Sequence, residues 1–86
     1  MYALRGYEIK DKLYESPRTL IYRAIRQKDN LSVIIKCFNT NKPTPQEIDQ
    51  FNYEFKVGSS MYSPFVVKYY ALEEYGPSKA IVISKS

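Results

Sequence analysis

The feature of this sequence that most restricts its fold is the run Val33-Ile34-Ile35, which is followed directly by Lys36. Three consecutive β-branched residues favour a β-strand, and an unbroken apolar run is typical of a strand covered on both faces. An ammonium group on such a strand is costly unless a carboxylate or phosphate lies within reach, or unless it extends to water. The sequence therefore predicts a central strand and a partner for Lys36 elsewhere in the chain.

Alternating apolar and polar residues predict further strands on either side of this run. Residues 7–13 and 20–26 precede it, separated by polar connections at 14–19 and 27–30. Short links of this kind predict an antiparallel arrangement. After the run, residues 65–72 and 79–84 have strand character, and the residues Tyr75-Gly76-Pro77-Ser78 between them predict a turn.

A helix is predicted between the third and fourth strands. Thr44 can cap it, Pro45 suits its first turn, and Glu47 completes a capping box with Thr44. The helix is expected to end before Ser63-Pro64, because the residue preceding a proline avoids the α region.

One face of this helix carries apolar residues at spacings of three and four: Ile48, Phe51, Phe55 and Gly58. A glycine inside a helix costs about 1 kcal/mol relative to alanine, so we expect Gly58 to permit close approach to the sheet. Glu54 lies about 60° from Phe51 around the helix axis, on the rim of the apolar face. Glu54 is therefore the candidate partner of Lys36.

Size and composition narrow the classes of function. The 86 residues suffice for one domain, and the net charge of +4 comes from 13 Lys and Arg spread along the chain. The sequence contains no histidine, which excludes a histidine general base or metal ligand. The single cysteine, Cys37, cannot form an internal disulfide, so we expect a packed, reduced thiol in a cytoplasmic protein. No segment is apolar enough for a signal peptide or a membrane span.

One alternative is binding of single-stranded nucleic acid by aromatic stacking. The residues that would carry it are Tyr22, Tyr69, Tyr70, Arg23, Arg26 and Lys68. Their charges alternate with positions expected to be buried, so nucleic acid is the less favoured partner.

Together, residues 7–86 resemble the N-terminal, ATP-binding lobe of a eukaryotic-type serine/threonine protein kinase. The segment 33–36 is similar to the motif whose lysine holds the α- and β-phosphates of ATP, and 51–54 resembles the helix segment whose glutamate pairs with that lysine. Residues 63–67 are similar to the stretch that leads into the fourth strand, and 81–84 to the fifth strand. Residues 13–36 also resemble bacterial kinase domains fused to sensor histidine kinases.

The resemblance implies an α+β fold, a five-stranded antiparallel sheet with one main helix between strands three and four. Residues 1–86 would form a single domain that ends at the hinge to a C-terminal lobe. ATP is the implied cofactor, with Mg²⁺ held through that other lobe. In addition to Lys36 and Glu54, the implied nucleotide-binding residues are Leu13, Ile21, Ile34 and Ile83 around the adenine, and Ser84 at the hinge.

Three departures from the family pattern bear on function. The glycine-rich loop of the family corresponds to residues 14–21, which contain no glycine, and Ile34 replaces the usual alanine. The His-Arg-Asp and Asp-Phe-Gly motifs, which supply the catalytic aspartate and the metal ligands, are absent from this chain. We therefore expect this piece to be inactive alone and its parent to be a serine/threonine kinase. The alternative is a pseudokinase-like module that binds a protein partner, or itself, through exposed sheet.

Overall fold

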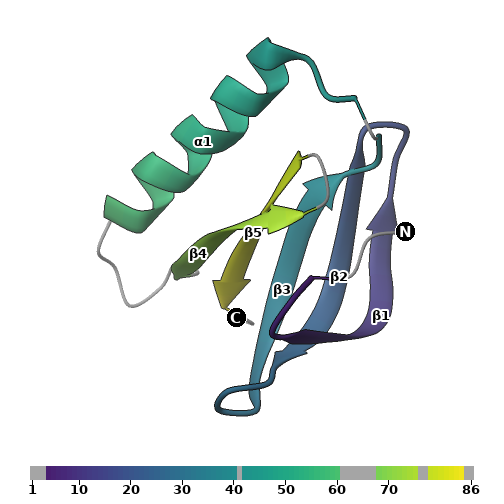
Figure 1. Ribbon diagram of the computed structural model, residues 1–86, viewed down its shortest axis with the longest axis vertical. Helices are drawn as coiled ribbons and strands as arrows, with labels where there is room; N and C mark the ends of the chain where they lie inside the picture. The colour runs from purple at the N-terminus through teal and green to yellow at the C-terminus, as the bar shows by residue number, and fades with distance from the viewer. Residues whose placement is uncertain (1–3, 41, 61–67, 76–77, 85–86) are drawn as a thin grey trace.

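The computed structural model describes residues 4–40, 42–60, 68–75 and 78–84. Five strands and one helix follow one another along the chain, as Figure 1 shows. Their bounds are β1 Tyr7–Glu15, β2 Thr19–Arg26, β3 Leu31–Phe38, α1 Pro45–Ser60, β4 Tyr69–Tyr75 and β5 Ser78–Ser84. The predicted α+β fold, with its helix after the third strand, is confirmed.

The strands form one sheet in the order β1-β2-β3-β5-β4, and every neighbouring pair is antiparallel. The last strand thus lies between β3 and β4. This arrangement makes β3 a central strand, with Lys36 opposite Ile21 on β2 and opposite Ile81 on β5.

The inner face of the sheet carries most of the core. On β3, Val33, Ile35 and Cys37 point inward and are almost fully buried. The same cluster contains Leu4, Tyr22, Ala24, Tyr75, Ala80 and Val82. Residues with opposite parity on the strands face outward, since successive strand side chains alternate between faces. Ile34 lies on this outer face and is only half-buried, so the prediction that both faces of β3 are fully covered is wrong there.

The sheet is curled so strongly that its two edge strands meet through side chains. Tyr7 on β1 donates a hydrogen bond to Glu73 on β4 (3.1 Å), and the guanidinium of Arg26 lies 5.0 Å from the ring centre of Tyr70. Two register shifts interrupt the pairing of β1 with β2, and bulges of this kind increase strand twist. Curling closes the inner face around its own apolar side chains, so no second layer is needed there.

The helix α1 lies over the β4–β5 side of the outer face, away from β1 (Figure 1). Its start is held by the predicted capping box: Thr44 N donates to Glu47 Oε1 at 2.9 Å, and Glu47 N donates to Thr44 Oγ1 at 3.1 Å. Phe51, the buried residue of the helix, packs its ring against Phe38 of β3 with 4.6 Å between centroids. These contacts set both the start and the rotation of the helix.

Several predicted boundaries differ from the structure. The first connection is shorter than predicted, because β1 continues to Glu15 and β2 begins at Thr19. The fourth strand continues to Tyr75, three residues beyond its predicted end, because the pairing with β5 extends to Tyr75 opposite Ser78. Tyr75 therefore belongs to a strand and not to the predicted turn. The predicted positions of 63–67 and of Gly76-Pro77 lie outside the described residues.

Cys37 is buried as a free thiol within the inner core, as predicted. Within the described ranges, no helix has the length and apolarity required to cross a membrane.

Candidate functional site

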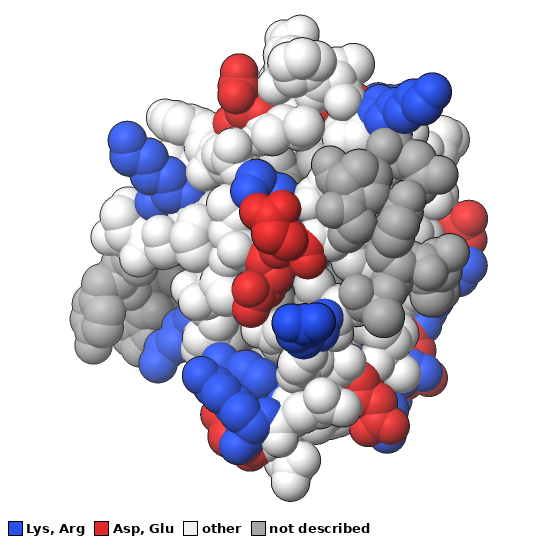
Figure 2. Space-filling view, viewed as in Figure 1, with Lys and Arg blue, Asp and Glu red and all other residues white. Residues whose placement is uncertain are grey.

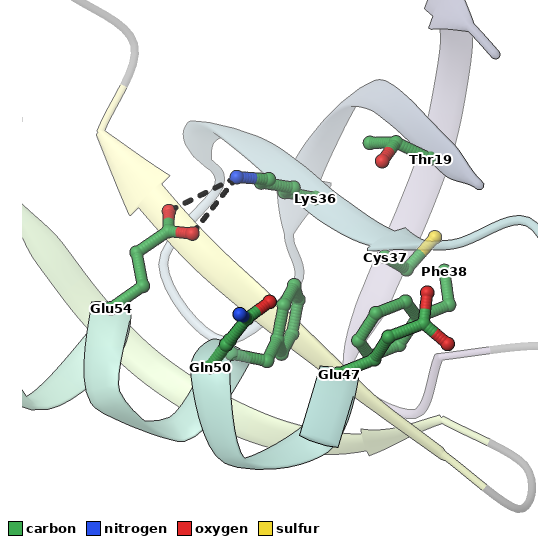
Figure 3. Close-up of a pocket in the computed structure, with 8 residues that line it drawn as sticks. Thr19, Lys36, Cys37, Phe38, Glu47, Gln50 and Glu54 are labelled. Carbon is green, nitrogen blue, oxygen red and sulfur yellow. Dashed lines mark hydrogen bonds and ion pairs between the residues drawn. The ribbon is translucent and has the colours of Figure 1, made fainter. Parts of the chain in front are cut away.

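The outer face of β3 brings Lys36 against the helix. Its Nζ lies 2.9 Å from Oε1 and 3.2 Å from Oε2 of Glu54, so the ammonium donates to both carboxylate oxygens (Figure 3). The side chains are 32% and 34% exposed, respectively. The pair is therefore accessible to solvent. A partly exposed ion pair of this kind contributes little to the stability of the fold, whereas the loss of one partner from a buried pair would be strongly destabilising.

Two local features place Glu54 at this point. The capping box begins the helix at a defined residue, and Phe51 anchors the first half of the helix on Phe38. Glu54 follows Phe51 by three residues, so it projects from nearly the same side, just beyond the buried contact. In this position the carboxylate reaches across to the sheet.

Tyr69, the first residue of β4, is a third member of this site that sequence analysis did not assign to it. Its hydroxyl donates a hydrogen bond to Glu54 Oε2 at 3.2 Å. Burial of the phenol, together with the nearby charge and hydrogen bond of Glu54, raises the pKa of Tyr69. The one available signal in the sequence was Gly58, which predicted close approach of the helix to the sheet.

A cavity of about 220 Å³ opens beside the ion pair, between the helix and the end of β3. Figure 3 shows Glu47, Gln50 and Glu54 projecting from the helix along it. The remaining lining residues are Thr19, Lys36, Cys37, Phe38 and Phe51. Polar side chains thus line both sides of the cavity, and Phe38 from the sheet and Phe51 from the helix add one aromatic ring each.

Apolar residues adjoin Lys36 on the same outer face. Ile21 lies directly opposite Lys36, and Ile34 lies directly opposite Ile83. All three isoleucines are only half-buried in this chain. They form an apolar patch on the face that carries Lys36, and apolar side chains beside a cation suit a ligand with an aromatic and an anionic part.

Leu13 is less closely placed than these isoleucines. It lies at a register shift in β1, where Tyr14 and not Leu13 is aligned opposite Ile21, and it is 53% exposed. Ser84, the last residue of β5, forms two hydrogen bonds within the protein. Its N–H donates to Lys68 O and its hydroxyl accepts from Lys68 N, both at 2.8 Å.

The loop between β1 and β2 is tied to its surroundings. The Ser16 hydroxyl accepts from the N–H of Thr19 at 3.0 Å, and the Asn39 side chain donates to Ser16 O at 2.7 Å. Arg18 forms a two-pronged ion pair with Glu47 at the start of the helix, with Nε 2.9 Å from Oε2. The tip of this loop is therefore joined both to the end of β3 and to the helix.

The residues of the nucleic-acid alternative do not form one surface. Tyr22 is buried in the inner core, Tyr69 contacts Glu54 on the outer face, and Tyr70 lies under Arg26. On the face in Figure 2, basic side chains occur in separate places beside acidic ones.

The described residues also include no group of three or more His, Cys, Asp or Glu that could hold a metal ion.

The five-stranded antiparallel sheet and the helix after β3 fit the fold of a protein kinase N-terminal lobe. Among solved structures, the chain is similar to the PpkA-294 apo form, a fragment of a bacterial serine/threonine kinase, with a TM-score of 0.80 and 14% sequence identity. The match covers 98% of this chain and 37% of that chain. No protein-family model and no curated protein matches the sequence.

Proposed function

We propose that this chain is the nucleotide-binding lobe of a serine/threonine protein kinase. In this role Lys36 contacts the α- and β-phosphates of ATP, and Glu54 holds the lysine in position. The observation that carries the proposal is the contact between Lys36 Nζ and both oxygens of Glu54 on the face that also presents Ile34 and Ile83.

The side chains on this face have the chemical groups that binding of a nucleotide requires. An ammonium has three donors, so Lys36 retains one after donating to both oxygens of Glu54, and its side chain is one-third exposed. Ile21, Ile34 and Ile83 offer the apolar contact that a purine ring requires. Bound ATP would supply the phosphoryl group, while this chain would position its phosphates and its base.

Binding by this lobe should be weak. The loop 16–18 lacks glycine, and its hydrogen bonds to Asn39 and its ion pair to Glu47 hold it in one place. Side chains on that loop keep its backbone N–H groups from approaching phosphates as closely as glycine permits. Lys36 therefore carries most of the phosphate contact. Catalysis would require the C-terminal lobe, with its aspartate and Mg²⁺ ligands.

Chemical-shift mapping of the ¹⁵N-labelled chain with MgATP tests the proposal. We expect dose-dependent changes at Lys36, Glu54 and Ile83, and loss of these changes in Lys36→Met. A titration with a short single-stranded DNA is the comparison. Changes around Tyr70 and Lys68 with DNA, and none around Lys36 with MgATP at millimolar concentration, would contradict the proposal.

A pseudokinase-like module is the second candidate, and the tied loop favours it. Arg18 joins the loop to the helix through Glu47, so the loop resembles a fixed structural connection more than a mobile phosphate cover. In that case the outer patch would bind a protein partner without nucleotide. Absence of MgATP binding to the parent protein with both lobes present would favour this function over the first.

A further inference from the structure

The side chain of Tyr69 lies between the sheet and the helix. Its ring meets that of Phe55 edge to face, with 6.3 Å between centroids, and its hydroxyl reaches Glu54 Oε2 at 3.2 Å. The ring is thus held by packing, while its polar end bonds to a carboxylate. A phenol with only two side-chain torsions loses little freedom when held in this way.

The helix has room for this ring because residue 58 is glycine. A Cβ at position 58 would lie 2.5 Å from Cδ1 and Cε1 of Tyr69 and 2.8 Å from Cγ. Gly58 follows Glu54 by one helical turn, so the two residues share one side of the helix. The ring therefore passes over position 58 to reach the carboxylate at position 54.

Glu54 is consequently held from two directions. Lys36 of β3 donates to Oε1 and Oε2, and Tyr69 of β4 donates to Oε2. These two strands are not neighbours, since β5 lies between them. A carboxylate that bonds to both restrains the helix relative to two separate strands.

We propose that Tyr69 is a positioning residue, which keeps Glu54 aligned with Lys36 in the nucleotide-free protein. Without the hydroxyl, Glu54 would have the ammonium as its only donor among the described residues, and both would move more freely toward solvent. This role rests on the proposed function for its effect on ATP, but the contact itself can be tested without nucleotide.

The test uses Tyr69→Phe, which removes the hydroxyl and keeps the ring, together with Glu54→Ala and the double variant. In an otherwise unchanged chain, Tyr69→Phe should weaken MgATP binding about three- to tenfold, the range of one ordinary net hydrogen bond. In the Glu54→Ala background, which leaves the Tyr69 hydroxyl no acceptor at position 54, the same change should alter the affinity less than about twofold. Equal losses in both backgrounds would overturn the proposal, because a purely structural tyrosine acts regardless of Glu54.

A nucleotide-free measurement separates this proposal from the proposed function. The ¹³Cδ resonance of Glu54 at neutral pH should move in Tyr69→Phe and remain unchanged in Tyr7→Phe. The matched control, Tyr7→Phe, removes the equivalent hydroxyl from Glu73 and should move the Glu73 resonance instead. If MgATP fails to bind but Glu54 responds to Tyr69→Phe, the proposed function falls and the positioning contact stands. If Glu54 does not respond, the positioning role is refuted whatever ATP does.

Discussion

The ring of Tyr69 occupies the space that a side chain at position 58 would fill. The expected use of Gly58, close approach of the helix to the sheet, is confirmed: a Cβ there would meet the ring carbons at 2.5 Å. The glycine weakens the helix by about 1 kcal/mol relative to alanine. This loss of helix stability at Gly58 allows the ring of Tyr69 on β4 to pack against α1.

Gly58→Ala is therefore expected to destabilise the chain, although alanine favours helix. Forcing a methyl group into a packed contact costs about 1 to 3 kcal/mol, which exceeds the gain in helix propensity. Urea unfolding followed by circular dichroism measures the change in free energy of unfolding. The control is Gly58→Ala in a Tyr69→Ala background, where the methyl group has room and should be neutral or stabilising. Destabilisation of equal size in both backgrounds would show that the ring is not the obstacle.

Lys36→Met separates the binding role of this lysine from its stabilising role. The pair with Glu54 is about one-third exposed, so its loss should change the free energy of unfolding by less than about 1 kcal/mol. MgATP affinity should fall about tenfold or more, because a charge-assisted contact to phosphate is lost. Thermal unfolding and the chemical-shift titration measure the two effects.

The matched control is Lys79→Met. Lys79 is 31% exposed and bonds to Glu74 at 2.8 Å, so its removal is a similar loss of one ion pair. It should leave MgATP affinity unchanged. A comparable loss of affinity in both variants would mean that net charge, and not the site, governs nucleotide binding.

The thiol of Cys37 is expected to be inert in the folded protein. Burial raises its pKa to about 11, and the side chain is 1% exposed. At pH 8 only about one thiol in a thousand would then be ionised, and the thiolate is the reactive form. Reaction with a disulfide reagent should therefore proceed only in denaturant, at a midpoint equal to that of unfolding. Rapid labelling in native buffer would contradict the packing of Cys37.

Stability should fall steeply in alkali because two tyrosines lose protons more readily in the unfolded chain. Burial, aided by the hydrogen bond to Glu73, raises the pKa of Tyr7 to about 12, and burial raises that of Tyr75 to about 12. Between the ordinary value of 10 and 12, the folded chain binds more protons than the unfolded one. The contribution is thus present below pH 10 and lost as the pH rises to 12. Urea midpoints measured from pH 8 to 12 should show this decline.

Tyr7→Phe tests the origin of that pH dependence. The variant lacks the phenol, so its stability should decline less steeply between pH 10 and 12 than that of the unmodified chain. Glu73→Gln should reduce the slope to a smaller extent, because burial is the larger cause of the raised pKa. An unchanged slope in Tyr7→Phe would assign the decline to other groups.

Local signals in the sequence accounted for the elements. Alternation marked the strands, and Thr44 with Glu47 marked the start of the helix, because periodicity and capping depend on residues only a few positions apart. Boundaries were less accurate. The fourth strand extends to Tyr75 because its pairing with β5 continues that far, and the pairing partner is not visible in either segment alone.

The sequence by itself determined that a cation would lie on a central strand and that Glu54 would lie on the rim of the apolar helix face. Only the tertiary structure decided that β5 enters between β3 and β4, that the curled sheet joins Tyr7 to Glu73, and that Tyr69 bonds to Glu54. The physical reason is the distance along the sequence over which each feature is determined. A residue's periodicity and cap are set by its neighbours in the chain, whereas these contacts depend on the twist of the whole sheet and on which side chains it leaves room for.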